Sequence, residues 1–483
     1  MAITLVIFYP VFFSDYLYTD EATQLWYTSK KLNFQTSVPQ GRYLTYKIFE
    51  WVFGHIHTVH QVIFARLFSL FGWLMCLPVW YFIINDITVK NKLPNLIVML
   101  TMIYLISMPP FTIFIAWSAC MEMFIACTIS LVAGYILYNG LKKDINEKIY
   151  LSTTRIVLTI TLGIVALFIY QNCFGCFFIP FFIHFIATKK ITKVICIGAA
   201  FSLLIVGFYY LIFKYTVNMY AVEASTRSAL ATNPINKLLF LFIGPLATAF
   251  NFTYIFKEKS IAGLLVYLVI AFAWLFANLF IQKNRSLSEK LIYLLGLIAF
   301  AKLIYLPSLI VKENYSSNRT LFALDLVVFL LLAETIFSFI KKDGVRYLTV
   351  GLLGIFFLIN AWYNFHKQFL DPVKAEYALL EAFINQHYQS GITTIYFISP
   401  SENTFKEKYD ISSSWDEFGV PSTAKIWVPE PLIKQLIFEK TGDRQLAEKI
   451  TINSWVNNEA FLESGKSSSK NILVINMQEM LAK

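Results

Sequence analysis

The run IAGLLVYLVIAFAWLFANLFI, residues 261–281, contains no charged side chain. A helix of about 20 apolar residues spans the roughly 30 Å hydrocarbon core of a bilayer, because each residue adds about 1.5 Å. Lipid offers the backbone no hydrogen-bond partner, so a spanning run of this kind is expected to be helical. Residues 70–84 and 321–340 are similar runs with few or no charges. Together these runs predict a polytopic membrane protein that is mainly α-helical.

The composition of the chain also favours a membrane protein over a large soluble core. Hydrophobic residues make up 57% of the 483 residues and charged residues only 14%, whereas soluble proteins carry about 25% charged residues. The net charge of +10 does not indicate a nucleic-acid partner, because the basic side chains lie in short gaps between apolar runs. That pattern is typical of cytoplasmic loops. The gap residues are Lys90, Lys92, Lys142, Lys143, Lys148, Lys189, Lys190, Lys193, Lys283, Arg285, Lys290, Lys341, Lys342 and Arg346.

With these gaps in the cytoplasm, the chain is expected to cross the membrane eleven times. Residues 237–256 are long enough to span, but a break at Gly244-Pro245 favours a re-entrant or interfacial segment. Eleven spans place the C terminus outside, and twelve would place it in the cytoplasm. Pro109-Pro110 is expected to break the chain on the outside between two spans. The expected spans are 1–13, 61–85, 94–108, 112–138, 154–171, 173–188, 194–213, 260–281, 291–310, 321–340 and 347–364.

The chain is expected to divide into two domains near residue 365. Residues 1–365 form the membrane bundle of eleven or twelve spans, with a long outer loop at 15–60. Residues 366–483 carry more charge and shorter apolar runs, which predict a small α/β domain outside the membrane. Its expected helices are 371–389 and 429–440, and its expected strands are 393–398 and 472–475.

All six cysteines lie in apolar segments, so the C-terminal domain has no disulfide framework. Cys173 and Cys176 have the CxxC spacing of a metal or redox motif. Because the surrounding run is apolar, the sequence favours a pair of buried thiols over a metal site.

The first outer loop carries the clearest chemical signal. Asp20-Glu21 directly follows the first apolar segment, and Gly41-Arg42 stands before the second span. Carboxylates at this depth lie where lipid headgroups meet water, and they can serve acid–base chemistry. Asp20 can equally be a solvated cap on a helix that begins near Ala22.

Three features carry a resemblance to the GT-C class of membrane glycosyltransferases, which use polyprenyl-phosphate-linked sugars. The resemblance extends over about residues 1–365 and is closest to the serotype-converting O-antigen glucosyltransferase family. Residues 366–483 depart from that branch, which commonly lacks a well-formed soluble tail. The features are Asp20-Glu21 at the start of a long outer loop, Gly41-Arg42 entering a helix, and Tyr170-Gln171 at the outer end of the fifth span.

The resemblance implies that an acceptor displaces a lipid phosphate at the anomeric carbon of the sugar, with inversion. Asp20 would be the base that takes the proton of the acceptor, and Glu21 would support it. Cations must balance the charge of the leaving phosphate, and the planar arginine side chain bonds two phosphate oxygens together. Arg42, Arg66 and Arg319 are the candidates, although Arg66 and Arg319 can also be interfacial anchors.

A sugar or acceptor pocket is implied around Glu122, Tyr170, Gln171 and Trp26. Glu122 lies near the outer end of a span, where an acid usually faces a cavity, and a buried hydrogen-bonded acid is the alternative. The Trp26 ring can stack on a sugar or lie at the membrane interface. In the tail, residues 415–422 can close over the site or recognise an acceptor, although a packed loop is the simpler interpretation.

A divalent cation is an alternative to a metal-free site. Mg²⁺ or Mn²⁺ would be held by Asp20, Glu21 and Glu122, and no other cofactor is expected.

The expected function is therefore an inverting glycosyltransferase of a bacterial plasma membrane, with its site and C-terminal domain on the extracytoplasmic side. Its partners would be a polyprenyl-phosphate sugar, a surface glycan or lipid-linked precursor as acceptor, and membrane lipid. One alternative is a transporter or flippase of lipid-linked glycans, which often shows repeated halves and charged pathways. A non-catalytic subunit of a glycan-assembly complex is the other alternative.

Overall fold

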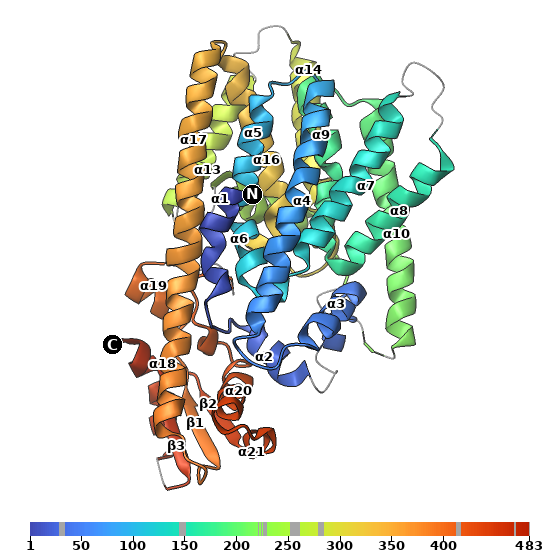
Figure 1. Cartoon of the computed structure of the whole chain (residues 1–483). Helices are drawn as coiled ribbons and strands as arrows, with labels where there is room; N and C mark the ends of the chain where they lie inside the picture. The colour runs from blue at the N-terminus through green and yellow to red at the C-terminus, as the bar shows by residue number, and fades with distance from the viewer. Residues whose placement is uncertain are drawn as a thin grey trace.

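Helices dominate the structure, a computed structural model in which 76% of the chain is helical and 4% is strand. This confirms the mainly helical prediction. The structure describes residues 1–28, 34–143, 151–220, 222–223, 225, 229–251, 261–278, 285–411, 417–467 and 470–482. The long helices run side by side, and the C-terminal domain lies beyond one end of the bundle (Figure 1).

Within the described residues, six helical segments are long and apolar enough to cross a membrane, and they indicate an integral membrane protein. A seventh is present if the bent pair α5 and α6 counts as one span. Shorter apolar helices lie at three more of the expected spans and at the segment expected not to span, so the number of spans stays a prediction. The six are α4 (Val62–Lys90), Ser118–Leu141 with most of α7 (Met123–Lys143), η5 (Gln171–Phe178) with α9 (Ile179–Thr188), α10 (Lys193–Met219), α16 (Asn318–Phe339), and α17 (Asp343–Tyr363) with its extension. The shorter ones are α1 (Ala2–Phe8) with η1 (Tyr9–Phe12), α8 (Thr153–Ile169), α11 (Pro234–Leu241) through α12 (Ala247–Asn251), and α13 (Ile261–Phe276).

Pro109-Pro110 does not separate two spans, which corrects the prediction. Helix α5 (Leu96–Ser107) continues into α6 (Pro109–Ala116) with a bend of 46°. The chain turns back only after α6, through the short helix η4 (Ser118–Cys120). A proline in the first turn of a helix is tolerated because its missing N–H would have had no partner there. The prolines therefore start a second helix instead of ending the segment.

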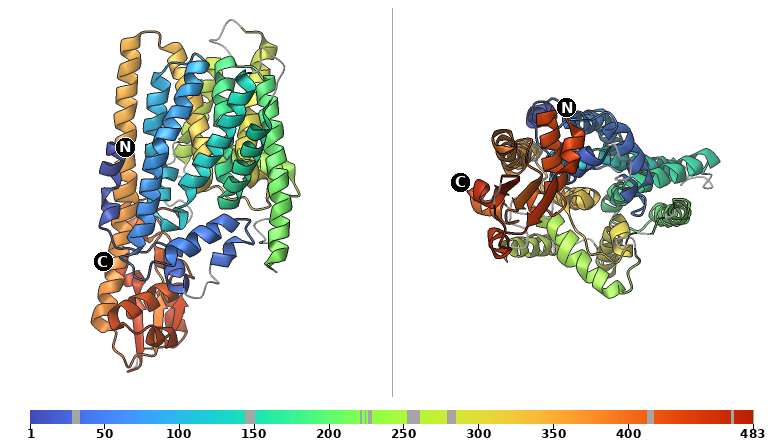
Figure 2. Two further views of the ribbon diagram at one scale, coloured as in Figure 1. Left: turned by 45° about the vertical axis from the view of Figure 1, so that its right-hand side comes forward. Right: turned by 90° about the horizontal axis from the view of Figure 1, so that it is seen from below.

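The bundle has two chemically different ends. Asn91, next to Lys90, bonds to His184, Lys189 pairs with Glu334, and Arg285 donates to the Lys189 carbonyl oxygen, so the described parts of these basic gaps gather at one end. The other end carries α2 (Asp20–Tyr27), α3 (Tyr43–Phe53) and the C-terminal domain (Figures 1 and 2). The structure thus separates the described basic gaps, at one end of the bundle, from the C-terminal domain at the other end.

Residues 234–251 lie along the end that carries the C-terminal domain. Lys237 donates to the Glu313 carbonyl oxygen at 2.8 Å, and a Cβ on Gly244 would lie 3.8 Å from Ser316. Both contacts are to the loop directly before α16. Pro245 lies in the wider π-helical turn η7 (Phe242–Leu246), as expected for a break. This placement favours the non-spanning interpretation.

The C-terminal domain contains a three-stranded parallel sheet in the order β2-β1-β3. The expected strands are present as β1 (Thr394–Ile398) and β3 (Ile472–Asn476), and β2 (Thr451–Trp455) was not expected. Because β2 is partly exposed and polar, it lacks the apolar run that predicts a buried strand. The helices are α18 (Asp371–His387), α19 (Thr404–Tyr409), η10 (Ser422–Ala424), α20 (Pro429–Thr441), α21 (Arg444–Lys449), α22 (Asn458–Glu463) and α23 (Met477–Ala482).

The expected boundary near residue 365 falls inside a continuous helical segment. Helix α17 passes through the π-helical turn η9 (Asn364–Leu370) directly into α18, so Asp343–His387 is one 45-residue segment. The C-terminal domain is therefore attached to the bundle by a helix and not by a linker (Figure 1).

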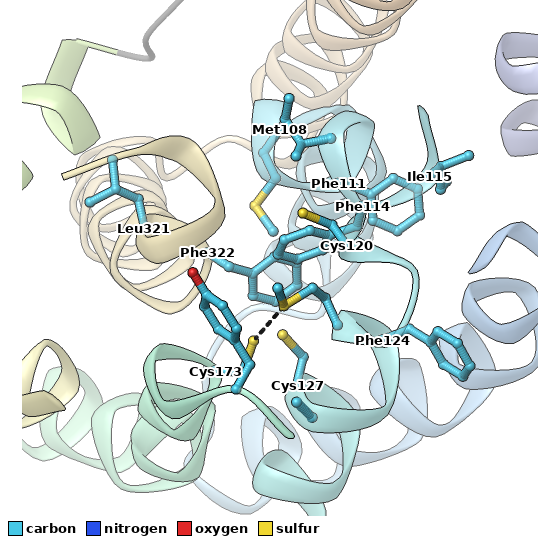
Figure 3. Close-up of a cluster of buried hydrophobic side chains, with 14 of the residues drawn as sticks. Met108, Phe111, Phe114, Ile115, Cys120, Phe124, Cys127, Cys173, Leu321 and Phe322 are labelled. Carbon is cyan, nitrogen blue, oxygen red and sulfur yellow. Dashed lines mark hydrogen bonds between the residues drawn. The ribbon is translucent and has the colours of Figure 1, made fainter. Parts of the chain in front are cut away.

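One part of the core is built from aromatic and sulfur-containing side chains of α6, α7, η5 and α16 (Figure 3). Phe322 of α16 stacks on Trp73 and Phe114, with ring centroids 5.5 Å and 5.4 Å apart. Cys173 and Cys176 are buried here, and the Cys173 sulfur lies 3.9 Å from that of Met123. Among the described residues, no three His, Cys, Asp or Glu side chains are grouped to hold a metal.

Candidate functional site

A cavity of about 340 Å³ opens at the end of the bundle that carries the C-terminal domain. Segments far apart in sequence form its walls, including α2, the turn before α3, η5, α10, α15 (Leu306–Ile310), α16 and a loop of the C-terminal domain. Five of the nine side chains expected at the site line it: Asp20, Arg42, Tyr170, Gln171 and Arg319. The other lining residues are Gln40, Leu167, Asn172, Val206, Tyr209, Tyr210, Phe213, Leu230, Pro307, Ser308, Ile310, Val311, Glu313, Tyr315, Thr320 and Trp427.

Asp20 is the first residue of α2 and lies half-buried at the cavity wall. Its Oδ1 accepts a hydrogen bond from Trp427 Nε1 at 3.1 Å. The helix begins at Asp20 with Thr19 as N-cap, so Asp20 is not the cap of a helix that starts near Ala22. Unpaired backbone N–H groups at a helix start favour a negative charge nearby. An acidic side chain at the start of α2 is therefore compatible with the fold.

The turn before Asp20 is strained. Thr19 has φ +40°, which is unusual for a β-branched residue. Its backbone N–H donates to Ser422 Oγ of the C-terminal domain at 3.0 Å. Such backbone strain costs about 1–3 kcal/mol and is retained mainly where a side chain must be aimed.

Arg42 is held in place at the cavity by a polar network. Its Nε donates to Gln171 Oε1 at 3.3 Å, and its guanidinium carbon lies 4.2 Å from the centre of the Tyr170 ring. Gln171 in turn donates to the Gln40 carbonyl oxygen and the Tyr209 hydroxyl at 2.7 and 2.8 Å. The two sequence features Gly41-Arg42 and Tyr170-Gln171 thus form one unit in the folded chain.

Gly41 is required by this network. It has φ +77°, and a Cβ there would lie 2.1 Å from the Tyr209 hydroxyl oxygen. Tyr209 donates to the Gly41 carbonyl oxygen at 3.0 Å, so it packs directly on this backbone.

A Gly41→Ala substitution is expected to destabilise the outer end by about 1–3 kcal/mol, because the left-handed backbone is strained for alanine. The substitution should also displace Tyr209 and Gln171, and it should therefore weaken the binding of any ligand that contacts Arg42. Thermal unfolding in detergent measures the stability, with Gly207→Ala on α10 as control because a Cβ there meets nothing within 4 Å. Equal unfolding midpoints for the two variants would contradict the requirement for glycine at position 41.

Arg319 is the second residue of α16 and is also held in place. Its Nη2 donates to the Tyr315 hydroxyl at 2.6 Å, and its guanidinium carbon lies 4.7 Å from the centre of the Trp117 ring. The fully buried Glu417 carboxylate accepts from the N–H groups of Asn318 and Arg319 at 2.7 and 3.1 Å. Glu417 Oε1 also lies 3.3 Å from Arg319 Nε. A carboxylate of the C-terminal domain therefore fixes the start of α16.

Arg42 and Arg319 act on the same region of the protein. Both interact electrostatically with Tyr170 and with the buried Glu122. Each guanidinium lies over an aromatic ring, which favours a fixed orientation. Two guanidinium groups that are held in one region can together bind an anion and stabilise its charge.

Glu122 is buried and does not line the cavity. Its Oε1 lies 3.2 Å from the Thr45 hydroxyl, which donates to the Ile169 carbonyl oxygen at 2.6 Å. Its Oε2 has no hydrogen-bond partner in the described part of the chain. The structure thus places Glu122 in the interior, as in the buried-acid alternative, and not in a sugar pocket.

Glu21 and Arg66 form a fully buried ion pair, which corrects their expected places in the site. Glu21 Oε2 accepts from Arg66 Nη2 at 2.6 Å, and both side chains have no exposed surface. Glu21 also accepts from the backbone N–H groups of Tyr18 and Ser118 at 2.7 and 2.6 Å. Adjacent residues at a helix start point about 100° apart, so Asp20 faces the cavity while Glu21 faces the core. Arg66 is therefore removed from the phosphate-binding candidates.

Trp26 also lies away from the cavity lining. It is buried between α2 and the C-terminal domain, with the Arg444 guanidinium carbon 4.4 Å from the centre of its ring. This contact joins the two domains, and the structure does not offer the ring to a ligand.

The metal alternative does not fit the positions of its three carboxylates. Glu21 is taken by Arg66, and Glu122 is buried beside Thr45, so neither meets Asp20 at the cavity. No chemical step is therefore assigned to a metal ion.

Sequence reasoning missed the cavity residues that come from distant segments. Trp427 of the C-terminal domain and Tyr209 of α10 line the cavity, and Glu417 of the C-terminal domain holds Arg319 beside it. The dense segment 415–422 was the available signal for the C-terminal domain, and its described part, from Glu417, reaches the site. Trp415 and Asp416 lie outside the described residues. No family model, curated protein or solved structure matches this chain.

Proposed function

We propose that this protein is an inverting membrane glycosyltransferase that uses a polyprenyl-phosphate-linked sugar. The proposal depends on one observation: Asp20, Arg42 and Arg319 line the same cavity. A carboxylate that can accept a proton thus shares one cavity with two cations that can hold a phosphate. The sequence resemblance to the GT-C class agrees with this arrangement.

The proposed reaction uses these groups as follows. An acceptor hydroxyl oxygen attacks the anomeric carbon of the sugar, and the bond from that carbon to the phosphate oxygen breaks. The hydroxyl proton passes to Asp20, which acts as general base. The phosphate leaves on its lipid with the bonding electrons, and Arg42 and Arg319 stabilise its charge. Attack from the side opposite the phosphate inverts the anomeric configuration.

The shape of the cavity supports a ligand with a polar head and an apolar tail. Its volume of about 340 Å³ suits a sugar phosphate, since ligand sites commonly range from about 300 to 1,000 Å³. Its wall between α10 and α15 includes the apolar side chains of Val206, Phe213 and Ile310 beside the rings of Tyr209 and Tyr210. Leu203 and Leu211 of α10 are exposed beside it, as expected for a lipid-facing helix. The prenyl chain would leave the cavity along this wall.

The charge asymmetry of the bundle supports an extracytoplasmic site. The basic gaps lie at the end opposite the cavity and the C-terminal domain, so the positive-inside rule places both outside. This orientation suits a bacterial plasma membrane, with a surface glycan or its lipid-linked precursor as acceptor.

The transfer itself is tested with purified protein in detergent micelles. Radiolabelled polyprenyl-phosphate glucose is the donor probe, and the acceptor is surface glycan from host cells that lack the gene. Label is expected to move to the glycan while free polyprenyl phosphate is released. Because a micelle has no two sides, a flippase would give no product in this assay. Absence of transfer from glucose and from other polyprenyl-phosphate hexoses would contradict the proposal.

Removing either cavity arginine is expected to weaken binding of the lipid phosphate. Arg42→Gln and Arg319→Gln should each reduce affinity for polyprenyl phosphate about tenfold or more, because a hydrogen bond to a charged group contributes about 1.5–3 kcal/mol. Equilibrium binding of radiolabelled polyprenyl phosphate in micelles measures this effect. Lys47→Gln is the control, since Lys47 is an exposed cation of α3 paired with Glu50. Equal losses for polyprenol, which has no phosphate, would show that the arginines do not recognise the phosphate.

A further inference from the structure

The C-terminal domain contributes a side chain to the cavity beside the proposed base. Trp427 lies between η10 and α20, lines the cavity, and donates its indole N–H to Asp20 Oδ1 at 3.1 Å. Its side chain is 44% exposed, so the hydrogen bond to Asp20 lies at the surface of the cavity. The two residues are 407 positions apart, and only the folded arrangement brings them together.

The loop that carries Trp427 is fixed to the rest of the protein. Glu376 of α18 is buried and accepts hydrogen bonds from the backbone N–H groups of Ser422 and Thr423, both at 2.8 Å. Ser422 Oγ accepts from the N–H of Thr19, the residue before Asp20. The loop is therefore hydrogen-bonded to α18 on one side and to the residue before α2 on the other.

Helix α20 is docked just as closely on the first outer loop. Gln435 donates to the His57 carbonyl oxygen at 2.9 Å, and Glu439 accepts from the Val59 N–H at 2.8 Å. Arg444 stacks on Trp26 of α2. With anchors on both sides of Trp427, its indole group keeps a defined position relative to Asp20.

We propose that Trp427 is a positioning residue for the transfer reaction and that the C-terminal domain thereby completes the catalytic site. The inference rests on the proposed function, in which Asp20 accepts the proton of the acceptor. The indole N–H fixes the orientation of the carboxylate and favours its ionised form, because a hydrogen bond to a charged acceptor stabilises that charge. A base held in this way meets the attacking hydroxyl in the geometry that the reaction needs.

This role differs from that of a wall residue. Loss of the N–H should reduce the rate of the chemical step, whereas the donor binds through its phosphate at Arg42 and Arg319. A wall residue would instead affect binding of the sugar or acceptor through its ring. Phenylalanine keeps an aromatic ring but removes the N–H donor together with part of the indole ring, so its effect must be compared with that of the same substitution away from the cavity.

The test compares Trp427→Phe with Trp455→Phe in the micelle transfer assay. Trp455 lies in β2 of the same domain and packs on Tyr396 and Phe461, away from the cavity lining. We expect Trp427→Phe to lower kcat by about ten- to a hundredfold, because small misplacements of a catalytic group cost up to about a hundredfold in rate. The KM for polyprenyl-phosphate glucose should change by less than threefold. Trp455→Phe should keep the wild-type kcat.

Two further readouts separate positioning from a general structural effect. In Trp427→Phe, the pH at which half of the activity is lost on acidification should rise, since the carboxylate loses a donor that favours its charged form. Trp427→His retains a ring N–H and should recover part of the rate. An unchanged kcat and pH profile in Trp427→Phe would overturn the inference, and so would equal losses in Trp455→Phe.

The Asp20→Asn variant shows which idea fails. If Asp20→Asn abolishes transfer and Trp427→Phe does not reduce it, the proposed function stands and only the positioning role is lost. If Asp20→Asn transfers sugar at the wild-type rate, the proposed function fails and the inference falls with it.

Discussion

An Asp20→Asn variant is expected to transfer sugar about 10²–10⁴ times more slowly than the wild type, because loss of a general base costs about that factor. Asparagine keeps the size of the side chain and can still accept the hydrogen bond from Trp427. It does not accept a proton in the range where a carboxylate does. The fold should therefore survive while turnover is lost.

The matched control is Asp15→Asn. Asp15 lies five positions before Asp20 at the same end of the bundle, where its exposed carboxylate pairs with His60 at 2.9 Å. Transfer by purified variants in micelles gives the rates, and the thermal unfolding midpoint confirms that both variants are folded. A normal rate in Asp20→Asn, or an equal loss in Asp15→Asn, would remove Asp20 from the proposed mechanism.

An Arg66→Met variant is expected to lose about 3–5 kcal/mol of unfolding free energy, because it leaves a buried carboxylate without its counter-charge. Glu21 would keep its two backbone donors, from Tyr18 and Ser118, but lose the guanidinium at 2.6 Å. Since this pair joins the start of α2 to α4, the cavity wall should loosen as well. Denaturant titration of the purified protein in mild detergent measures the change.

The exposed pair Lys47–Glu50 is the control for this prediction. Its side chains are 44% and 31% exposed, so Glu50→Gln should change stability by about 0–1 kcal/mol. A double variant, Glu21→Gln with Arg66→Met, should be more stable than Arg66→Met alone, because no buried charge remains unpaired. If Arg66→Met lowers the unfolding free energy by no more than Glu50→Gln does, the buried Glu21–Arg66 pair does not stabilise the fold as its burial implies.

The helical bundle could be predicted from sequence because apolar runs and basic gaps follow directly from the chemistry of a bilayer. Local sequence signals were less reliable where the same residues can form two different structures. Pro109-Pro110 can end a helix or begin one, and here the pair begins α6. Strand β2 was missed because its partly exposed face carries polar side chains. Composition alone places the domain boundary near residue 365, but a continuous helical segment joins the two domains there, so no linker marks the boundary.

At the candidate site, five of the nine residues named from the sequence line the cavity, and the sequence did not predict the directions of the side chains. Asp20 and Glu21 are adjacent and chemically alike, yet one faces the cavity and the other pairs with Arg66 in the core. A linear pattern does not record this rotation about the helix axis. The partners from the C-terminal domain were also out of reach, because Trp427 and Asp20 meet only in the folded chain.

The most direct test of a catalytic carboxylate at this cavity is chemical rescue of an Asp20→Ala variant by sodium formate. Transfer from radiolabelled polyprenyl-phosphate glucose is followed in micelles, with sodium chloride at equal ionic strength as the reference. We expect transfer to fall about 10²–10⁴-fold in the variant and then to recover saturably as formate takes the place of the missing carboxylate. Transfer by Asp20→Ala at the wild-type rate without formate would contradict the account.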